Sequence, residues 1–197
     1  MLKIGITGGI GSGKTTVSRI FEMLGIPVYN ADREAKKLMT HDKVLKNRII
    51  KLLGTESFTK DELNREYIAS KVFNDKDLLK KINSIVHPVV KEDFVKWTEN
   101  QNGPYVLYEA ALMVESGNYR LMDKIIVVTA PIELRIGRVC QRDKVDVDKA
   151  SARINNQLSQ EEMLKFADHV INNDGSSSLI RQVLELDKIF TSYQMLH

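Results

Sequence analysis

The chain has 197 residues, of which 43% are hydrophobic and 28% charged, with a formal net charge of +3 and a single cysteine, Cys140. No apolar stretch approaches the roughly 20 residues of a membrane span, and one cysteine excludes an internal disulfide framework, so we predict a globular cytoplasmic protein without a membrane partner. The net charge is too small to argue for a nucleic-acid partner.

The first predicted element is a strand over residues 2–7, and the eight residues that follow it form a GxxxxGK[ST] motif. Its glycines allow the loop to turn several backbone N–H groups inward around an anion, and a helix predicted over 14–24 points its positive end at the same place. In such loops the lysine bridges the outer phosphates and the hydroxyl reaches Mg²⁺. The alternative, a turn without a ligand, has no use for a lysine beside a threonine. The predicted nucleotide contacts are Gly9, Ile10, Gly11, Ser12, Gly13, Lys14, Thr15 and Thr16, with Thr15 as the metal ligand.

A second strand is predicted over residues 26–29, and Asp32 follows it at the edge where ligands of open α/β sheets bind. Two interpretations of Asp32 remain open. Its carboxylate could accept a proton from a substrate hydroxyl, or it could cap a helix that begins around Arg33.

The next segment, residues 32–103, is predicted to be an almost entirely helical insertion that binds the acceptor substrate. One helix is expected to start at Asp61. Another is expected to start at Asp75 and to run to Trp97, with Pro88 near a boundary or kink.

Three further strands are predicted over residues 105–108, 124–129 and 169–171, with helical patterns between them. This alternation favours a three-layer α/β fold with a five-stranded parallel sheet. A last helix, residues 178–193, carries an apolar stripe that should pack on the sheet: Leu179, Val183, Leu186 and Phe190. The predicted core is residues 1–31, 104–138 and 167–197, in a single domain.

Residues 139–166 have the size and charge of a mobile helical lid. Arg135, Arg138 and Arg142 recur before and at its start with helical spacing, so two or three of them can project toward the phosphates. Arginine forks stabilise the charge that spreads over a transferred phosphoryl group. We therefore predict catalytic roles for Lys14, Arg138 and Arg142, with exposure on the surface as the alternative for each arginine.

Motifs along nearly the full length resemble those of the dephospho-coenzyme A kinase family. The phosphate loop is shared with many families, whereas the His-Pro element, the Leu-Met-Val-Glu stretch and the final Ala-Asp segment are more particular. The matching segments are 7–14, 31–32, 63–65, Val72-Phe73, 82–88, 112–115, 141–143, 153–157 and 167–175.

The resemblance implies transfer of the ATP γ-phosphoryl group to the ribose 3′-hydroxyl of dephospho-coenzyme A, with Mg²⁺, by a monomer or weak homo-oligomer. It implies that Asp32 is the general base or orients the hydroxyl, and that Asn173 and Gly175 lie near the adenine. Without the resemblance, His87 would be read as a packed or capping residue. The implied substrate-binding residues are Thr7, Asp32, Arg65, His87, Glu109 and Glu115; Glu109 could instead join the Mg²⁺ network.

Three departures from the family pattern stand out. Asn30 replaces the first acid of an Asp-Ala-Asp motif, and residues 111–115 replace Pro-Leu-Leu-Phe-Glu while keeping the acid, Glu115. The family often has a basic residue near Met163, for which Lys165 is the nearby candidate.

Two other functions remain possible from the residues alone. Another P-loop kinase, acting on a nucleoside or nucleotide, would share the loop, the lid and the fold. A nucleotide-dependent switch or assembly ATPase is the third possibility, although residues 172–175 lack the lysine of a guanine-reading Asn-Lys-x-Asp element.

Overall fold

The computed structural model describes residues 1–72 and 75–194, so Phe73 of the quoted motifs lies outside the described residues. The chain divides into two compact units. The first comprises Met1–Tyr29 and Gln101–His197, and the second comprises Asn30–Asn100. Among the described residues, no helix combines the length and the apolar character that a membrane span requires.

The first unit is built on a five-stranded sheet in the order β2-β5-β1-β6-β7. The central strand β1 pairs in parallel with β5 and β6, and β6 pairs in parallel with β7. The strands are β1 (Leu2–Thr7), β2 (Val28–Asn30), β5 (Tyr105–Glu109), β6 (Lys124–Thr129) and β7 (His169–Asn172). The parallel sheet predicted from the alternation of strands and helices is therefore confirmed.

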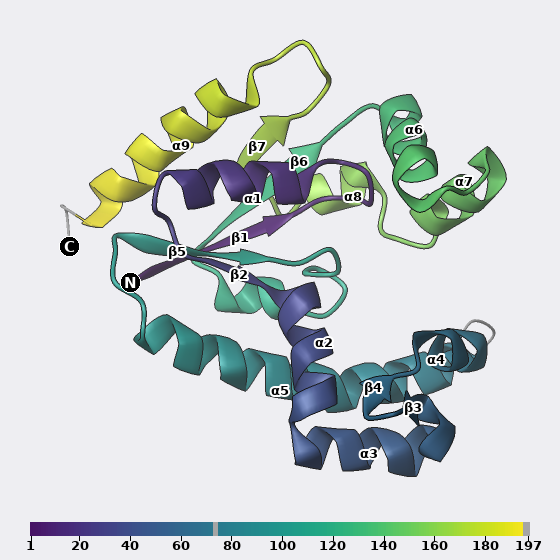
Figure 1. Ribbon diagram of the computed structural model, residues 1–197. Helices are drawn as coiled ribbons and strands as arrows, with labels where there is room; N and C mark the ends of the chain where they lie inside the picture. The colour runs from purple at the N-terminus through teal and green to yellow at the C-terminus, as the bar shows by residue number, and fades with distance from the viewer. Residues whose placement is uncertain (73–74, 195–197) are drawn as a thin grey trace. The chain divides into compact units, whose positions relative to one another are not determined.

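The helices α1 (Lys14–Met23) and α9 (Leu179–Gln194) lie against each other on one face of this sheet (Figure 1). Val17 and Phe21 of α1 and Val183 and Phe190 of α9 are fully buried in one apolar cluster with the sheet residues. The expected packing of the last helix on the sheet is confirmed. Burial of this stripe, rather than helix propensity, is what fixes α9 in place.

On the sheet's other side, Met163 of α8 (Gln160–Leu164) packs against Ile125 and Val127 of β6. Tyr119, in the short 3₁₀ helix η2 (Asn118–Leu121), joins this cluster and makes an edge contact with the Phe166 ring. Met163 is thus a core residue. Its place in the core explains why a basic side chain at that position would not fit here.

Two helices, α6 (Ile132–Asp143) and α7 (Val147–Asn155), follow β6 and pack against each other. Figure 1 shows them at the end of the sheet toward which the strand arrows point, beside the loop between β1 and α1. In a parallel sheet, ligands bind outside the carboxyl ends of the strands, so both helices stand at the edge where a site is expected.

The second unit contains four helices among its described residues and a small hairpin. The helices are α2 (Ala31–His41), α3 (Lys43–Leu53), α4 (Arg65–Val72) and α5 (Lys76–Glu99). The helix α5 contacts α2, α3 and α4, and its buried stripe runs at helical spacing through Ile82, Val86, Val90 and Phe94. Asp75 caps α5 by accepting a hydrogen bond from the Leu78 amide, as predicted for a helix start at this residue.

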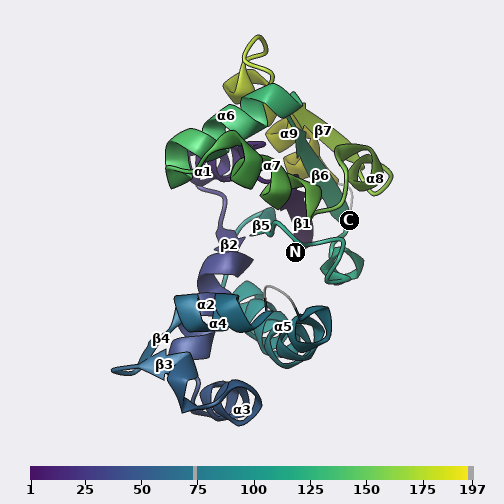
Figure 2. The ribbon, with the colours of Figure 1, turned by 90° about the vertical axis from the view of Figure 1, so that its right-hand side faces the viewer.

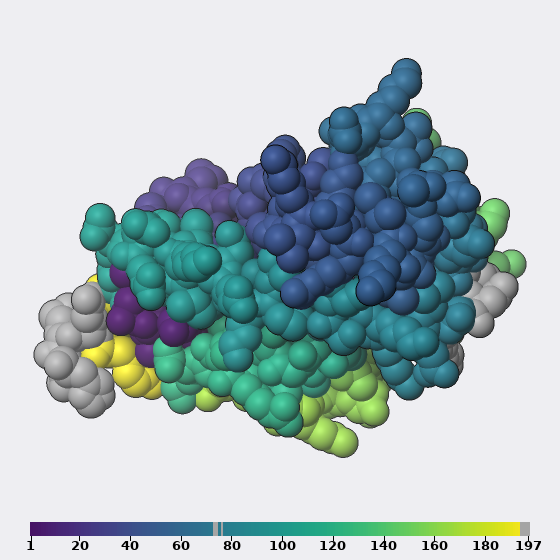
Figure 3. Space-filling model, turned by 90° about the horizontal axis from the view of Figure 1, so that it is seen from below, coloured from purple at the N-terminus to yellow at the C-terminus, as the bar shows by residue number. Residues whose placement is uncertain are grey.

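Two expectations for this unit are wrong. The 3₁₀ turn η1 (Thr55–Ser57) leads into an antiparallel hairpin of β3 (Phe58–Thr59) and β4 (Glu62–Leu63), so no helix starts at Asp61, whose φ is +68°. Figures 2 and 3 show this hairpin standing out from the surface of its unit. The predicted boundary at Pro88 is also wrong, because α5 continues through it, whereas the alternative of a kink there stays a prediction.

Candidate active site

The loop between β1 and α1 adopts a conformation that requires glycine at three positions. Gly8, Gly11 and Gly13 have φ values of +146°, +80° and +99°, a region that side chains with a Cβ rarely enter. Gly13 is the last residue before α1 and has no side chain to cap it, so the first amides of the helix are left for another acceptor. An anion at this point would meet those amides and the positive end of the helix dipole.

The two side chains that open α1 carry the polar chemistry of the loop. The Lys14 ammonium group donates to the carbonyl oxygen of Gly8 at 2.7 Å and to that of Gly9 at 3.3 Å. The Thr15 hydroxyl donates to Oε1 of Glu109 at 2.7 Å, and Glu109 is 5% exposed at the end of β5. A cation and a hydroxyl–carboxylate pair therefore stand together at the start of the helix.

The Thr15–Glu109 pair suits a small hard cation. Mg²⁺ prefers oxygen ligands and usually retains water and phosphate oxygens, so it needs only one or two protein ligands. Among the described residues, no group of three His, Cys, Asp or Glu side chains could hold a metal by itself. A hydroxyl and a buried carboxylate are therefore the donor set expected for a metal that arrives with a nucleotide.

The outer side of the loop is held by side chains from α6 and from the segment after β7. Arg138 donates to the carbonyl oxygens of Gly11 and Ser12 at 3.2 and 3.4 Å, and to Asn173 at 3.2 Å. The Asn173 amide donates to the Ser12 carbonyl at 2.7 Å. Because Arg138 and Asn173 hold the carbonyl oxygens of Gly11 and Ser12, they stabilise the conformation of the loop.

Two predicted nucleotide contacts, Ile10 and Ser12, and the predicted substrate-binding residue Thr7 are bonded or buried in the structure. The Ile10 N–H donates to Oε1 of Gln157 at 2.7 Å, so its hydrogen bond is made within the protein. Thr7 and Ser12 are buried, and their hydroxyls have no hydrogen-bond partner among the described residues. Since Thr7 is closed to solvent, its predicted contact with a substrate requires the end of β1 to rearrange.

The predicted lid arginine, Arg142, lies at the end of α6 in an ion-pair cluster. Its guanidinium donates to Asp143 at 2.7 and 3.0 Å, and Arg153 of α7 donates to the same carboxylate at 2.7 Å. The hydrogen bond from Arg142 is the main reason why the pKa of Asp143 lies below its usual value. Arg142 thus contacts α7 through a shared partner, whereas Arg138 contacts the loop directly.

Two further predicted residues lie near the end of the sheet. Glu115 is exposed after β5, where its Oε1 accepts a hydrogen bond from the Leu158 amide at 3.3 Å. Gly175 has a φ of +90° in the turn after β7, and a Cβ there would meet open space. The space beside Gly175 is wide enough for a ligand to approach the backbone.

In the second unit, the capping interpretation of Asp32 is wrong. Asn30 caps α2: its side-chain oxygen accepts a hydrogen bond from the Arg33 amide at 2.9 Å. Asp32 lies one residue inside α2 and is exposed. The replacement of an acid by Asn30 therefore preserves a helix cap, because asparagine and aspartate cap equally well.

Arg65 and His87 both belong to helices of this unit. Arg65 is exposed and opens α4, whose start is fixed by Asn64 accepting a hydrogen bond from the Tyr67 amide at 3.1 Å. His87 is half-buried in the middle of α5, so the alternative that it caps a helix is wrong. Burial lowers the pKa of His87 below its ordinary value of 6.5.

We expect the half-buried His87 to make folding stability sensitive to mild acid. The unfolded chain takes up a proton near pH 6.5, whereas the folded chain does so only at lower pH, so stability falls as pH drops through this window. His87→Gln should remove that part of the slope. Thermal melts between pH 5 and 8 check this, and identical pH profiles of the two proteins would contradict it.

The fold and this site define a class of protein. A glycine loop between a central parallel strand and a helix, with Lys14 and Thr15 at the helix start, is the phosphate site of P-loop nucleotide-binding proteins. The Arg138 side chain that bonds this loop is a feature that fits P-loop kinases, which stabilise a transferred phosphoryl group with such cations.

Comparison with known proteins specifies the family. The family model for dephospho-CoA kinase matches residues 2–178. A dephospho-CoA kinase of Bacteroides fragilis is 41% identical over 197 residues, covering 100% of this chain and 95% of that protein. The chain belongs to the dephospho-CoA kinase family.

Solved structures agree with this assignment. A crystal structure of TT1252 from Thermus thermophilus superposes with a TM-score of 0.85 at 30% identity, covering 95% of this chain and 96% of that one. Dephospho-CoA kinase from Campylobacter jejuni superposes with a TM-score of 0.69 at 27% identity, covering 96% and 97% of the two chains. The likeness therefore extends over almost the entire fold.

Proposed function

We propose that this chain transfers the γ-phosphoryl group of ATP to the ribose 3′-hydroxyl of dephospho-coenzyme A, giving coenzyme A and ADP. The proposal is carried by one observation: a complete phosphate site, with Lys14 and the Thr15–Glu109 pair, occurs in a chain of this family. The bond that forms joins the acceptor oxygen to the γ-phosphorus. The bond that breaks joins that phosphorus to the oxygen that stays on ADP.

We assign the phosphates to the loop and its cations. The amides at the start of α1 bind the phosphate oxygens. Lys14 gives up its hydrogen bonds to the carbonyl oxygens of Gly8 and Gly9 and donates to the outer phosphates instead. Arg138 and Arg142 supply donors to the charge that develops on the transferred group. Asn173 and Gly175 lie on the adenine side in this assignment.

We assign the proton of the acceptor hydroxyl to Asp32. An ionised carboxylate accepts a proton as the oxygen attacks, and Asn30 already fills the capping role that would otherwise occupy Asp32. Residues 32–103 form the acceptor-binding insertion, with Arg65 and His87 on the acceptor side. Glu115 also belongs to that side, and residues 139–166 supply a lid that closes over the nucleotide while Met163 of α8 stays packed on β6.

Thr15 would hold Mg²⁺ directly and Glu109 would hold it or a water bound to it. When bound, the ion supplies positive charge against the phosphate oxygens. We also propose that the protein works in the cytoplasm, as a monomer or weak homo-oligomer, without nucleic acid or membrane as a partner.

An acceptor assay tests the proposal. Purified protein with Mg-ATP should phosphorylate dephospho-coenzyme A far faster than it phosphorylates nucleoside monophosphates, measured by the ADP released and by the mass of the product. Faster transfer to a nucleotide would favour a different kinase. Hydrolysis without acceptor at the same rate would favour a switch or assembly ATPase.

A further inference from the structure

Both backbone polar groups of Ile10, in the phosphate loop, form hydrogen bonds with side chains, and we call this pair of bonds the grip. Its carbonyl oxygen accepts a hydrogen bond from Nε of Arg135 at 3.0 Å, and its N–H donates to Oε1 of Gln157 at 2.7 Å. Arg135 comes from α6 and Gln157 from the segment between α7 and α8. Two elements distant in sequence therefore meet on one residue of the loop.

The arginine is built into the outer wall of the loop. Arg135 is 5% exposed, and a Cβ added to Gly9 would collide with its guanidinium, which therefore lies next to Gly9. A Cβ added to Gly11 would lie 2.6 Å from the carbonyl oxygen of Arg135 itself. Arg135 thus contacts Gly9, Ile10 and Gly11 at once.

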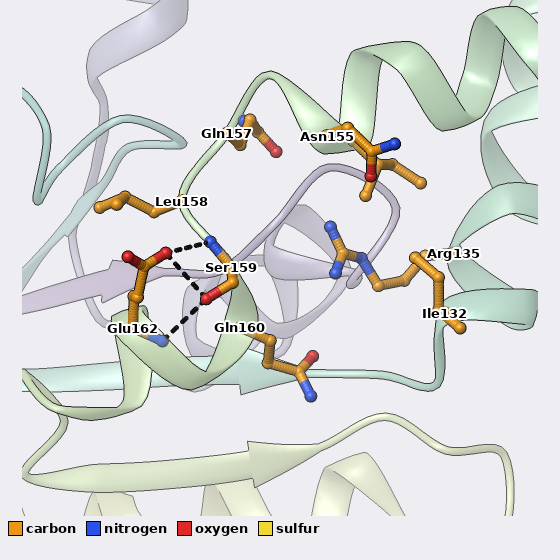
Figure 4. A pocket seen from close by; sticks show the side chains of 9 residues that line it. Ile132, Arg135, Asn155, Gln157, Leu158, Ser159, Gln160 and Glu162 are labelled. Carbon is orange, nitrogen blue, oxygen red and sulfur yellow. Dashed lines mark hydrogen bonds between the residues drawn. The ribbon is translucent and has the colours of Figure 1, made fainter.

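Both gripping side chains line a pocket of about 530 Å³, shown in Figure 4. The pocket lies against the first turns of α6, the end of α7 and the start of α8. Burial lowers the pKa of Arg135, but the guanidinium stays charged at neutral pH because its ordinary pKa is very high. Arg135 contacts the loop itself at Ile10, and the prediction that two or three of Arg135, Arg138 and Arg142 project toward the phosphates stays a prediction.

We propose that Arg135 and Gln157 are positioning residues, which hold the loop at Ile10 in the shape that binds the ATP phosphates. They act through the loop and not on the substrate. Because Gln157 belongs to residues 139–166, the proposed lid, the grip also makes the loop's shape depend on where that segment lies.

The test uses a matched pair of glutamines. Gln160 lines the same pocket, and its Oε1 likewise accepts a backbone hydrogen bond, from the Ala130 amide at 3.1 Å, outside the loop. Gln157→Leu and Gln160→Leu therefore each remove one such bond. We expect Gln157→Leu to raise the Kd and KM for ATP about tenfold, the loss that one hydrogen bond accounts for, while leaving the KM for dephospho-coenzyme A unchanged.

Gln160→Leu should leave all three constants at their wild-type values, although both variants lose similar thermal stability. Equal ATP affinity in the two variants, whether both normal or both weakened, would overturn the proposal. ATP binding measured by calorimetry without acceptor separates this result from the acceptor assay, since a kinase with another acceptor would still show the difference.

A second experiment displaces the Arg135 side chain without removing it. Gly9→Ala introduces the Cβ that collides with the Arg135 guanidinium, so it should displace the side chain and weaken ATP binding by about the same factor. In an Arg135→Met background the collision is absent, and Gly9→Ala should have no further effect. If Gly9→Ala weakened ATP binding equally in both backgrounds, the grip of Arg135 would not be the cause.

Discussion

Lys14→Ala is expected to weaken ATP binding about 10- to 100-fold and to lower turnover by a further factor of about 100 to 1,000. The ammonium group donates to two carbonyls of its own loop, at 2.7 and 3.3 Å, and is thus already held at the site before nucleotide arrives. Its removal takes away a charged donor in both the bound state and the transition state.

Arg19→Ala is the matched control, because it removes a positive charge from the same helix at an exposed position away from the loop. That variant should keep near-normal Kd and kcat. Calorimetric titration with Mg-ATP and steady-state assays measure both constants. Wild-type ATP affinity in Lys14→Ala would show that the triphosphate binds elsewhere.

Asp32→Asn is expected to lower kcat by about 100- to 10,000-fold while changing ATP affinity only a few-fold. The amide keeps the size of the side chain but cannot take up the hydroxyl proton. Because Asn30 caps α2, the substitution leaves the helix start intact. A loss confined to kcat would therefore report on chemistry.

The control for Asp32 is Glu34→Gln, two residues further along α2. Glu34 also lies in the first turn of the helix and pairs with Lys37 at 2.9 Å and Arg33 at 3.0 Å, so its loss removes comparable helix electrostatics. Glu34→Gln should retain turnover within about twofold. Comparable losses of kcat in the two variants would assign Asp32 a structural role instead of a proton-accepting one.

The sheet was predictable because its strands are covered on both faces. The apolar runs over 2–7 and 124–129 coincide with β1 and β6, whose inner residues are almost all buried. The second strand starts two residues later than predicted, at Val28. Pro27 lacks an N–H, and so it contributes only its carbonyl, which accepts a bond from the Leu107 amide at 2.9 Å.

The insertion was less predictable because its signals are short or conflicting. The strands β3 and β4 have two residues each, and their turn uses Lys60 and Asp61 at positive φ instead of the Asn-Gly pair that announces such turns. From the sequence alone, Pro88 indicated a boundary or kink in the helix α5. Burial of the stripe around it outweighs the hydrogen bond that proline removes.

In the site, local motifs were readable and long-range contacts were not. Lys14 and Asn30 bond residues close in sequence, although only the structure separates Asn30 from Asp32 as the cap. Arg135 and Gln157 reach Ile10 across 125 and 147 residues. The helical spacing of Arg135 hinted at a role, but no pattern in one sequence indicates which side of a loop an arginine approaches.

The crowding around the loop has a consequence for protein engineering. Added side-chain carbon at Gly9, Gly11 or Gly13 would strike Arg135 or Asn173, which belong to parts of the chain more than a hundred residues away. The eight-residue motif, residues 8–15, therefore depends on the rest of this fold for its conformation. Grafted into a foreign nucleotide-binding scaffold, it should recover its native affinity only when counterparts of α6 and of the segment after β7 are transplanted with it.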